Sequence, residues 1–253
     1  MEAKKQVWSS GGGVQSTAIA AMICAGKLPK PDLAVIADTG REYTPVFEYI
    51  NAVVIPALWR SGVELHIAPH SLATVDLWSG KDGDTLVIPA FTDQAGQRGK
   101  LPKYCSQEWK TRVVQRFCRQ HGITDADQWI GFTIDEMERM RVYREGASWQ
   151  HVYPLIDARM TRGDCLALIE RMGWPPPPRS ACWMCPFRSD DEWRLMLDES
   201  PGDFQLAVDF ERAAQKRDPN VFLHRSCKPL DTVDFEGEPD LFSKPCNAGG
   251  CFT

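Results

Sequence analysis

The sequence lacks any hydrophobic run approaching the roughly 20 residues that a membrane-spanning helix requires. Its first residues, Met1–Lys5, are mostly polar and lead into a short apolar segment. We therefore expect no secretory leader, no membrane partner and a cytoplasmic location. Positive charge is not in excess either, because the formal net charge is −5, which argues against a large non-specific nucleic-acid surface. With 43% hydrophobic and 25% charged residues among 253, the chain is neither disordered nor fibrous and can bury a full core.

Cysteine is the plentiful reactive residue, with nine copies. In a chain without an export signal these are more readily thiols, metal ligands or redox groups than a disulfide framework, and nine cannot all pair internally. Cys182 and Cys185 form a CxxC pair, a spacing that lets two thiolates hold one metal centre, and Pro186 stops the local chain from continuing as helix. A [4Fe–4S] cluster is the first interpretation. A structural Zn²⁺ ion and unmetallated redox thiols are the alternatives.

A glycine-rich loop, SSGGGVQST at Ser9–Thr17, lies between a short apolar segment and a predicted helix. Glycines allow a positive φ and a close approach of backbone N–H groups to phosphate oxygens, while the helix N-terminus favours negative charge. The loop is not a Walker loop, because no Gly-Lys-Ser/Thr follows the glycines. Its glycine spacing is also not that of a GxGxxG fingerprint. It predicts nucleotide phosphate binding by Ser10, Gly11, Gly12, Gly13, Ser16 and Thr17.

Strand-like and helix-like segments alternate along the first half of the chain. The continuous apolar run Leu33–Ala37 is typical of a parallel strand buried on both faces, with functional residues at its carboxyl end. Further strands are expected at 63–67 and 128–132, and helices at 16–25, 44–58 with Thr44 as N-cap, and 107–120. This order predicts an α/β fold with an open, mostly parallel sheet and helices on both faces.

The pattern also predicts a division of the chain. Residues 1–160 are expected to form a nucleotide-binding α/β domain. Within it, residues 71–103 hold four glycines but no sustained periodicity, which predicts an insertion or lid. Residues 161–253 are expected to form a cysteine-rich C-terminal region that begins with a helix over 162–172, capped by Thr161 and Asp164, and continues as a helical tail.

Four segments resemble, in the same order, motifs of the PP-loop ATP pyrophosphatase and phosphoadenosine phosphosulfate (PAPS) reductase family. They are the loop at Ser10–Thr17, ADTGRE at 37–42, GFTIDEMER at 131–139 and YPLID at 153–157. The resemblance implies the adenine nucleotide alpha hydrolase-like, Rossmann-like fold. It also implies an enzyme that binds an adenine nucleotide, ATP or PAPS, with Mg²⁺.

The resemblance implies roles for single residues as well. Gly131 and Arg139 are implied to bind the cofactor. Asp38 is implied to lie near the adenosine or a metal-bound phosphate and is a candidate catalytic residue, although it is equally placed to cap its own turn. Asp135 or Glu136 is the candidate for holding Mg²⁺ together with phosphate oxygens.

The family's cysteine spacing adds Cys105 to the pair at Cys182 and Cys185 as a third ligand of a metal centre. Cys227 is the candidate for a fourth ligand. Its alternatives are Cys165, which we regard as a buried core thiol, and Cys246 and Cys251 near the end of the chain.

The sequence also departs from the family pattern. Gln15 stands where many PP-loop enzymes carry aspartate, Ser106 replaces the second cysteine of a pair, and Ala158 replaces a tryptophan. The ECGLH-type nucleophile segment of the reductases is absent. If the chain is a reductase, Cys246 or Cys251 is therefore the expected catalytic nucleophile.

Three functions follow from the resemblance and its departures. The first is adenylation-linked sulfur transfer from ATP chemistry, with a sulfur donor protein and a tRNA or DNA acceptor as candidate partners. The second is reduction of PAPS or adenylylsulfate to sulfite with a thioredoxin-like reductant. The third is a nucleotide-binding accessory protein without turnover, which Gln15 favours. A homo-oligomer is compatible with each.

Overall fold

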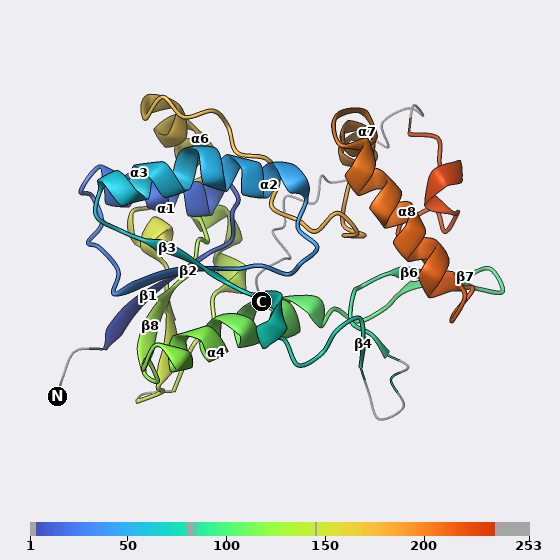
Figure 1. Cartoon of the computed structure of the whole chain (residues 1–253), viewed down its shortest axis with the longest axis horizontal. Coiled ribbons are helices and arrows are strands. Elements are labelled where there is room, and N and C mark those ends of the chain that lie inside the picture. The colour runs from blue at the N-terminus through green and yellow to red at the C-terminus, as the bar shows by residue number, and fades with distance from the viewer. Residues whose placement is uncertain (1–3, 80–82, 84, 145, 236–253) are drawn as a thin grey trace. The chain divides into compact units, whose positions relative to one another are not determined.

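A computed structural model describes residues 4–79, 83, 85–144 and 146–235 of the chain (Figure 1). Its contacts divide the chain into two compact units. Among the described residues, the first contains 4–72 together with Trp109–Ser180, and the second contains Ala73–Glu108 together with 181–235. Each unit is thus assembled from two stretches that are distant in sequence.

The first unit is built on a five-stranded sheet. Its strands, in spatial order, are β3 (Leu65–Ala68), β2 (Leu33–Ala37), β1 (Lys5–Ser10), β8 (Ala126–Trp129) and β9 (Trp149–Val152). Every neighbouring pair is parallel, and in the central strand Val7 lies opposite both Leu33 and Gln128. The chain moves outward from β1 to β3 and then crosses to β8, so a topological switch point lies between β1 and β8. The predicted open parallel α/β sheet is confirmed.

Helices cover both faces of this sheet. Right-handed crossovers place α1 (Val14–Cys24) and α3 (Ile55–Arg60) on one face and α4 (Arg112–Gln120) on the other, as Figure 1 shows. The short helix α5 (Pro154–Asp157) and α6 (Arg162–Arg171) both pack against α1. Among the described residues, no helix combines the length and the apolar character needed to cross a membrane.

Local capping explains where one of these helices, α6, begins. Thr161 accepts a hydrogen bond from the backbone N–H of Asp164, whose side chain accepts one from the Thr161 N–H, so the predicted capping box of α6 is confirmed. A continuous helical stretch is formed by α2 (Thr44–Tyr49), a π-helical segment at Ile50–Val54 and α3. Its N-cap lies one residue before the expected N-cap, Thr44. Tyr43 is its N-cap and Thr44 its first helical residue, without a side-chain cap.

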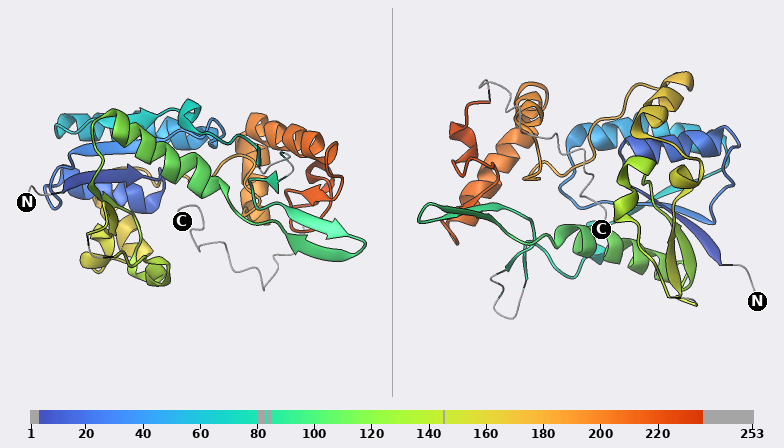
Figure 2. Two further views of the ribbon diagram at one scale, coloured as in Figure 1. Left: turned by 90° about the horizontal axis from the view of Figure 1, so that it is seen from below. Right: turned by 180° about the vertical axis from the view of Figure 1, so that it is seen from behind.

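The second unit combines small antiparallel sheets with two helices. The strands are β4 (Trp78–Ser79) paired with β5 (Thr85–Leu86), and the hairpin of β6 (Phe91–Gln94) and β7 (Gln97–Lys100) joined by β10 (Val221–Phe222). Figure 2 shows the β6–β7 hairpin as two antiparallel arrows joined by a tight turn. Helices α7 (Asp190–Glu199) and α8 (Pro201–Gln215) pack on each other, and α8 also contacts β10.

These units differ from the expected division at residue 160. Helix α6 belongs to the first unit because its buried face, with Cys165, Leu168 and Ile169, packs against α1. The segment 71–103, expected as an insertion or lid, pairs through β6 with β10 from the C-terminal part and so shares the second unit with it. The physical cause is pairing between segments distant in the chain, which periodicity alone does not reveal.

Candidate nucleotide site and cysteine turn

The glycine-rich loop is a tight connection from β1 to α1. Only three glycines separate Ser10, the last residue of β1, from Val14, the first of α1. Gly12 has a φ of +74°, and a Cβ added there would lie 3.0 Å from Val46 Cγ1 and 3.1 Å from Ile50 Cδ1. Glycine at this position is therefore favoured both by the backbone conformation and by close packing against α2 and the π-helical segment that follows it.

The hydroxyl groups of the loop shape its backbone. The Gly11 N–H donates to Ser16 Oγ over 2.7 Å, and the Gly12 N–H donates to Ser10 Oγ over 3.3 Å. The Ser180 hydroxyl donates to the carbonyl oxygen of Gly11. Ser10 and Ser16 are both buried, so these hydroxyls fix the loop from within before any ligand is bound.

Thr17 fastens the loop to the neighbouring helix. It is buried and hydrogen-bonded to the Tyr49 hydroxyl, which donates to the carbonyl oxygen of Pro175 over 2.8 Å. Burial raises the pKa of Tyr49 to about 12, so the phenol stays protonated. The hydroxyl of Thr17, predicted to bind phosphate, thus has a structural partner, and its contact with a nucleotide stays a prediction.

The first turn of α1 supplies the donors for an anion. Its N-cap is Gly13, and no side chain caps this end of the helix. The backbone N–H groups of the first turn have no partner within the helix, and the helix dipole favours negative charge beside them. A Cβ added at Gly13 would lie 3.2 Å from Ser180 Cβ, so this glycine also keeps the loop close to the segment before the second unit.

Gly131, which follows β8, meets α1 at the switch point. A Cβ added at Gly131 would lie 3.2 Å from Gln15 Cβ and 3.4 Å from the backbone nitrogen of Ser16. The structure thus brings the predicted residues of the loop and of the GFTIDEMER segment together. In open parallel sheets, ligands bind beyond the carboxyl ends of the strands at this point.

Gln15 is the centre of a polar network that sequence analysis did not anticipate. Its Nε2 donates to Glu136 Oε2 over 3.0 Å, and its Oε1 accepts from Arg162 Nη1 over 3.2 Å. Glu136 is buried and also pairs with Arg139, whose guanidinium lies 4.2 Å from the centre of the Phe132 ring. Arg139, predicted to bind the cofactor, is therefore held by an ion pair beside the loop.

The carboxylate candidates for Mg²⁺ are engaged in protein contacts. Both oxygens of Glu136 are used by Gln15 and Arg139. One oxygen of Asp135 accepts hydrogen bonds from the Thr133 hydroxyl and from the Arg162 N–H. A role in holding Mg²⁺ stays a prediction for either residue.

Asp38, at the end of β2, caps its own turn. Its Oδ1 accepts the Gly40 N–H over 2.7 Å, and Gly40 has a φ of +66°. This is the local role that sequence analysis gave as the alternative to nucleotide binding. A catalytic or nucleotide contact of Asp38 stays a prediction.

The residues after Asp38 form a buried charged group that sequence analysis missed. Glu42 Oε1 accepts from the Thr39 hydroxyl over 3.1 Å and lies 3.4 Å from Lys110 Nζ. Arg41 donates through Nη1 to His70 Nε2 over 2.9 Å, and its guanidinium lies 4.8 Å from the centre of the Trp109 ring. The ADTGRE motif signals that Glu42 matters, but nothing in the sequence pairs it with Lys110.

The candidate metal ligands Cys105, Cys182, Cys185 and Cys227 lie in the second unit. The Cys185 N–H donates to the carbonyl oxygen of Cys182 over 3.1 Å, so the CxxC pair forms a tight turn, and both residues are half-buried. Cys105 is also half-buried, and its N–H donates to the Val87 carbonyl oxygen. Within residues 4–235, gaps aside, no group of three or more His, Cys, Asp or Glu side chains is arranged to hold a metal ion. The described residues thus provide a turn that suits two thiolate ligands but not a complete ligand set for a cluster.

The other predicted cysteines have different surroundings. Cys227 has a φ of +53°, and its Sγ donates to the Thr92 carbonyl oxygen over 3.6 Å. Burial raises the pKa of Cys227, and burial raises the pKa of Cys165 to about 12. Ligation of a metal by Cys227 or by Cys165 stays a prediction. Cys246 and Cys251 lie outside the described residues.

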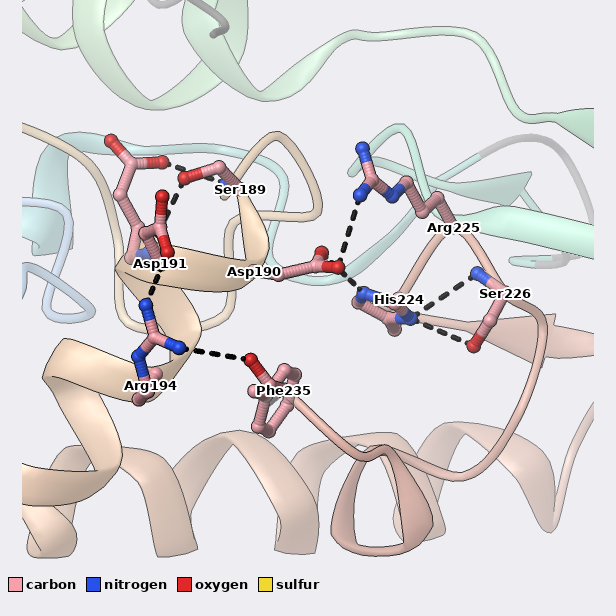
Figure 3. Close-up of polar contacts among 9 residues, drawn as sticks. Ser189, Asp190, Asp191, Arg194, His224, Arg225, Ser226 and Phe235 are labelled. Carbon is pink, nitrogen blue, oxygen red and sulfur yellow. Dashed lines mark hydrogen bonds and ion pairs between the residues drawn. The ribbon is translucent and has the colours of Figure 1, made fainter. Parts of the chain in front are cut away.

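A further polar network joins α7 to the segment after β10 (Figure 3). His224 is buried. Its Nε2 lies 3.0 Å from Asp190 Oδ1, and its Nδ1 lies 2.7 Å from Ser226 Oγ. Because Nδ1 also accepts the Ser226 N–H, the proton is on Nε2 and is donated to Asp190. Arg225 pairs with the other Asp190 oxygen over 3.0 Å, so this network fixes the chain that leads to Cys227.

The fold and the loop together define an open parallel α/β protein with a glycine-rich strand-to-helix turn at its switch point. No protein-family model matches the sequence, and no curated protein matches it. Among solved structures, the chain is similar to phosphoadenylyl-sulfate (PAPS) reductase from Candida auris in a phosphate complex. That match has 13% identity and a TM-score of 0.44, and it covers 70% of this chain and 81% of that one. It is also similar to the U34-tRNA thiolase NcsA from Methanococcus maripaludis with its [4Fe-4S] cluster, at 13% identity and a TM-score of 0.45, covering 93% of this chain and 75% of that one.

Proposed function

We propose that the chain is a PP-loop enzyme that binds ATP at Ser10–Thr17 and uses it for adenylation-linked sulfur transfer. The observation that carries this proposal is the loop itself. A Cβ at Gly12 would lie only 3.0 Å from Val46 Cγ1 and 3.1 Å from Ile50 Cδ1. The Ser10 and Ser16 hydroxyls accept N–H groups of the loop itself, and the N-cap of α1 is Gly13, which has no side chain to cap the helix. Such a turn offers backbone N–H donors and the positive end of the helix dipole to phosphate oxygens. Both interactions favour an anionic ligand over a neutral one.

The proposed reaction has two steps. An oxygen of the acceptor attacks the α-phosphorus of ATP, the bond from that phosphorus to the bridging oxygen breaks, and pyrophosphate leaves. A hydrosulfide ion delivered by a donor protein then attacks the adjacent acceptor carbon through its sulfur, the bond from that carbon to the adenylated oxygen breaks, and AMP leaves with the oxygen. The N–H groups of the first turn of α1 would stabilise the charge that develops on the α-phosphate.

The cysteine turn is the proposed place for the sulfur chemistry. The CxxC spacing and the half-buried positions of Cys182 and Cys185 support a metal centre there, with Cys105 as a further ligand in our proposal. An iron–sulfur cluster would supply sulfur or electron chemistry when bound. A tRNA or DNA acceptor and a homo-oligomer remain part of the proposal.

A second function is favoured by the network at Gln15. Gln15 carries no charge where many PP-loop enzymes carry aspartate. The neighbouring carboxylate of Glu136 is used by Gln15 and Arg139, so it is not offered to a metal–nucleotide complex. This arrangement is expected of a protein that binds the nucleotide without turning it over.

One experiment separates these functions. Full-length protein, prepared without oxygen, is incubated with ATP, PAPS or adenylylsulfate, and pyrophosphate, AMP and sulfite are measured. Sulfur transfer predicts pyrophosphate and AMP from ATP once an acceptor RNA or DNA is added, and no sulfite. Sulfite that disappears in Cys246→Ser or Cys251→Ser protein would instead establish the reductase. Tight ATP binding with no product from any nucleotide would establish the accessory protein.

A further inference from the structure

A cavity of about 410 Å³ lies in the first unit at the far end of α1 from the glycine-rich loop. It is lined by Met22 and Lys27 from the end of α1, by Ala158 and Arg159 after α5, and by Leu168 and Arg171 from α6. Met22 lies about 12 Å along α1 from its first residue, so this cavity is separate from the proposed nucleotide site. Its volume falls within the range of about 300–1,000 Å³ that small-molecule sites occupy.

Positive charge dominates the lining. Lys27, Arg159 and Arg171 are all exposed at the cavity, and Asp164 is its single acidic residue. The Asp164 carboxylate accepts hydrogen bonds from the hydroxyl and the N–H of Thr161, which hold its pKa below the usual range, so it remains ionised and committed to the start of α6. The cavity therefore carries a net charge of about +2 at neutral pH.

Arg159 occupies a backbone position that suits glycine better. Its φ is +53°, and its N–H donates to the Ile156 carbonyl oxygen where α5 ends. A non-glycine residue in this conformation costs stability that glycine would avoid, and such positions gather at ligand sites. Among the residues that the structure describes, no side chain forms a hydrogen bond or ion pair with the side chains of Arg159 or Lys27. No side-chain contact of the Arg159 guanidinium among the described residues therefore accounts for arginine, and not glycine, at this backbone position.

We propose that this cavity binds a small organic phosphate monoester. Lys27, Arg159 and Arg171 would hold the phosphoryl oxygens. The organic part would lie on Ala158 and Met160, the lining residues whose apolar surface is open to solvent. A phosphate monoester carries a charge close to −2 at pH 7, which matches the net charge of the cavity, whereas a phosphodiester carries only −1. The charge match therefore favours a monoester over a strand of nucleic acid.

The test is calorimetric titration of the full chain with uridine 5′-monophosphate (UMP) in the presence of excess MgATP, which occupies the loop. We expect UMP to bind and uridine not to bind. The dinucleotide UpU, a phosphodiester, should bind at least about tenfold more weakly than UMP, because it lacks one charge. Below pH 6 UMP binding should weaken, since the second phosphate pKa is about 6.

Two variants assign the binding to this cavity. Arg159→Gly removes the guanidinium and suits the backbone, so it should fold at least as well as wild type and bind UMP about tenfold more weakly. Ala158→Trp fills the space for the organic part, so it should lose UMP but still bind inorganic phosphate. Arg60→Ala, which removes an exposed cation from α3, is the matched control and should leave UMP binding unchanged.

Three results would overturn the proposal. The first is no UMP binding by wild type at millimolar concentration. The second is equal UMP binding by wild type, Arg159→Gly and Ala158→Trp, which would place UMP elsewhere, for example at the loop. The third is tight binding of oligouridylate with none of UMP, which would make the cavity a contact for a nucleic-acid strand.

Discussion

The glycine-rich loop and the cysteine turn differ in how much of each site one stretch of sequence supplies. Nine consecutive residues provide the turn, the inward hydroxyls and the helix N-terminus of the loop. The CxxC turn provides two thiols and a single backbone hydrogen bond between them, and every further ligand must come from a distant part of the chain. A contiguous site can be identified from sequence and checked in a structure, whereas a dispersed site can only be tested by removing its members.

The two regions also differ in how they are held without a ligand. The loop is fixed by buried hydroxyls and by close packing of Gly12 against Val46 and Ile50. Cys182 and Cys185 are half-buried, and the described contact between them is one backbone hydrogen bond. The first region should therefore respond to substitution with lost stability, and the second with lost cofactor.

The largest effect is expected at the cysteine turn. Cys182→Ser and Cys185→Ser should each abolish iron binding in protein prepared without oxygen, because serine is a poor ligand for a cluster. Cys227→Ser is the matched control and should retain iron, since the Cys227 thiol donates to the Thr92 carbonyl oxygen. Iron and labile sulfide are measured per chain.

Zinc in place of iron, with one ion per chain lost in the same two variants, would support the structural alternative. Full metal content in both variants would show that the CxxC turn is not a metal site. Loss of iron in Cys227→Ser would make that residue a ligand despite its raised pKa.

The next effect is expected at the loop. Gly12→Ala should lower the free energy of unfolding by about 3 kcal/mol, from a left-handed backbone and contact with Val46 and Ile50. It should also weaken ATP binding at least tenfold, as the loop shifts. Gly26→Ala is the matched control, because Gly26 has a φ of +68° but no atom within 4 Å of an added Cβ. It should cost about 1 kcal/mol and leave ATP binding unchanged.

These two variants are compared by denaturant unfolding and by ATP titration. Equal destabilisation would show that backbone conformation, and not packing, dictates the glycine at position 12. Unchanged ATP binding by Gly12→Ala would remove the loop as the nucleotide site.

A smaller loss is expected at a buried carboxylate in the second unit. Glu211 on α8 accepts the Leu223 N–H over 2.7 Å and the Leu230 N–H over 2.6 Å, and it is 1% exposed. Glu211→Gln places an amide N–H against one of these donors, so the free energy of unfolding should fall by about 2 kcal/mol. Asp209→Asn, exposed on the same helix, should change it by less than about 0.5 kcal/mol.

Denaturant unfolding monitored by tryptophan fluorescence measures this difference. A Glu211→Gln protein as stable as wild type would mean that the chain from Leu223 to Leu230 is held by other contacts, such as the network at His224.

The elements that could be predicted from sequence are those fixed by neighbouring residues. The loop, the buried strand Leu33–Ala37 and the capping box at Thr161 each rest on interactions within a few positions, and each is found as predicted. The strand Trp149–Val152 was missed, because its residues show no alternation and are all half-buried at the edge of the sheet.

Pairings across the chain could not be predicted for a different reason. Glu42 with Lys110 and Gln15 with Glu136 depend on which strands become neighbours, and that order is set by the whole fold. The hairpin within 71–103 was likewise missed, because its partner strand β10 lies far along the sequence. Sequence motifs thus named several of the right residues without showing their contacts.

The smallest effect is expected from His151, in the edge strand β9. Burial lowers the pKa of His151 from 6.5 to about 4, with a smaller contribution from Arg141. As pH falls below 6.5, the unfolded chain binds a proton at this histidine and the folded chain does not, so stability is lost between pH 6.5 and 4. The loss should reach about 1 kcal/mol at pH 5, allowing for partial solvent exposure. His151→Phe should lose less stability than wild type on going from pH 7 to pH 5, because phenylalanine does not titrate and retains ring contacts with Tyr143 and Tyr153.

His121→Gln, exposed at the end of α4, is the control and should keep the acid loss of wild type. Urea unfolding at the two pH values measures the difference, and an identical loss in His151→Phe and wild type would show that His151 does not titrate as its burial requires.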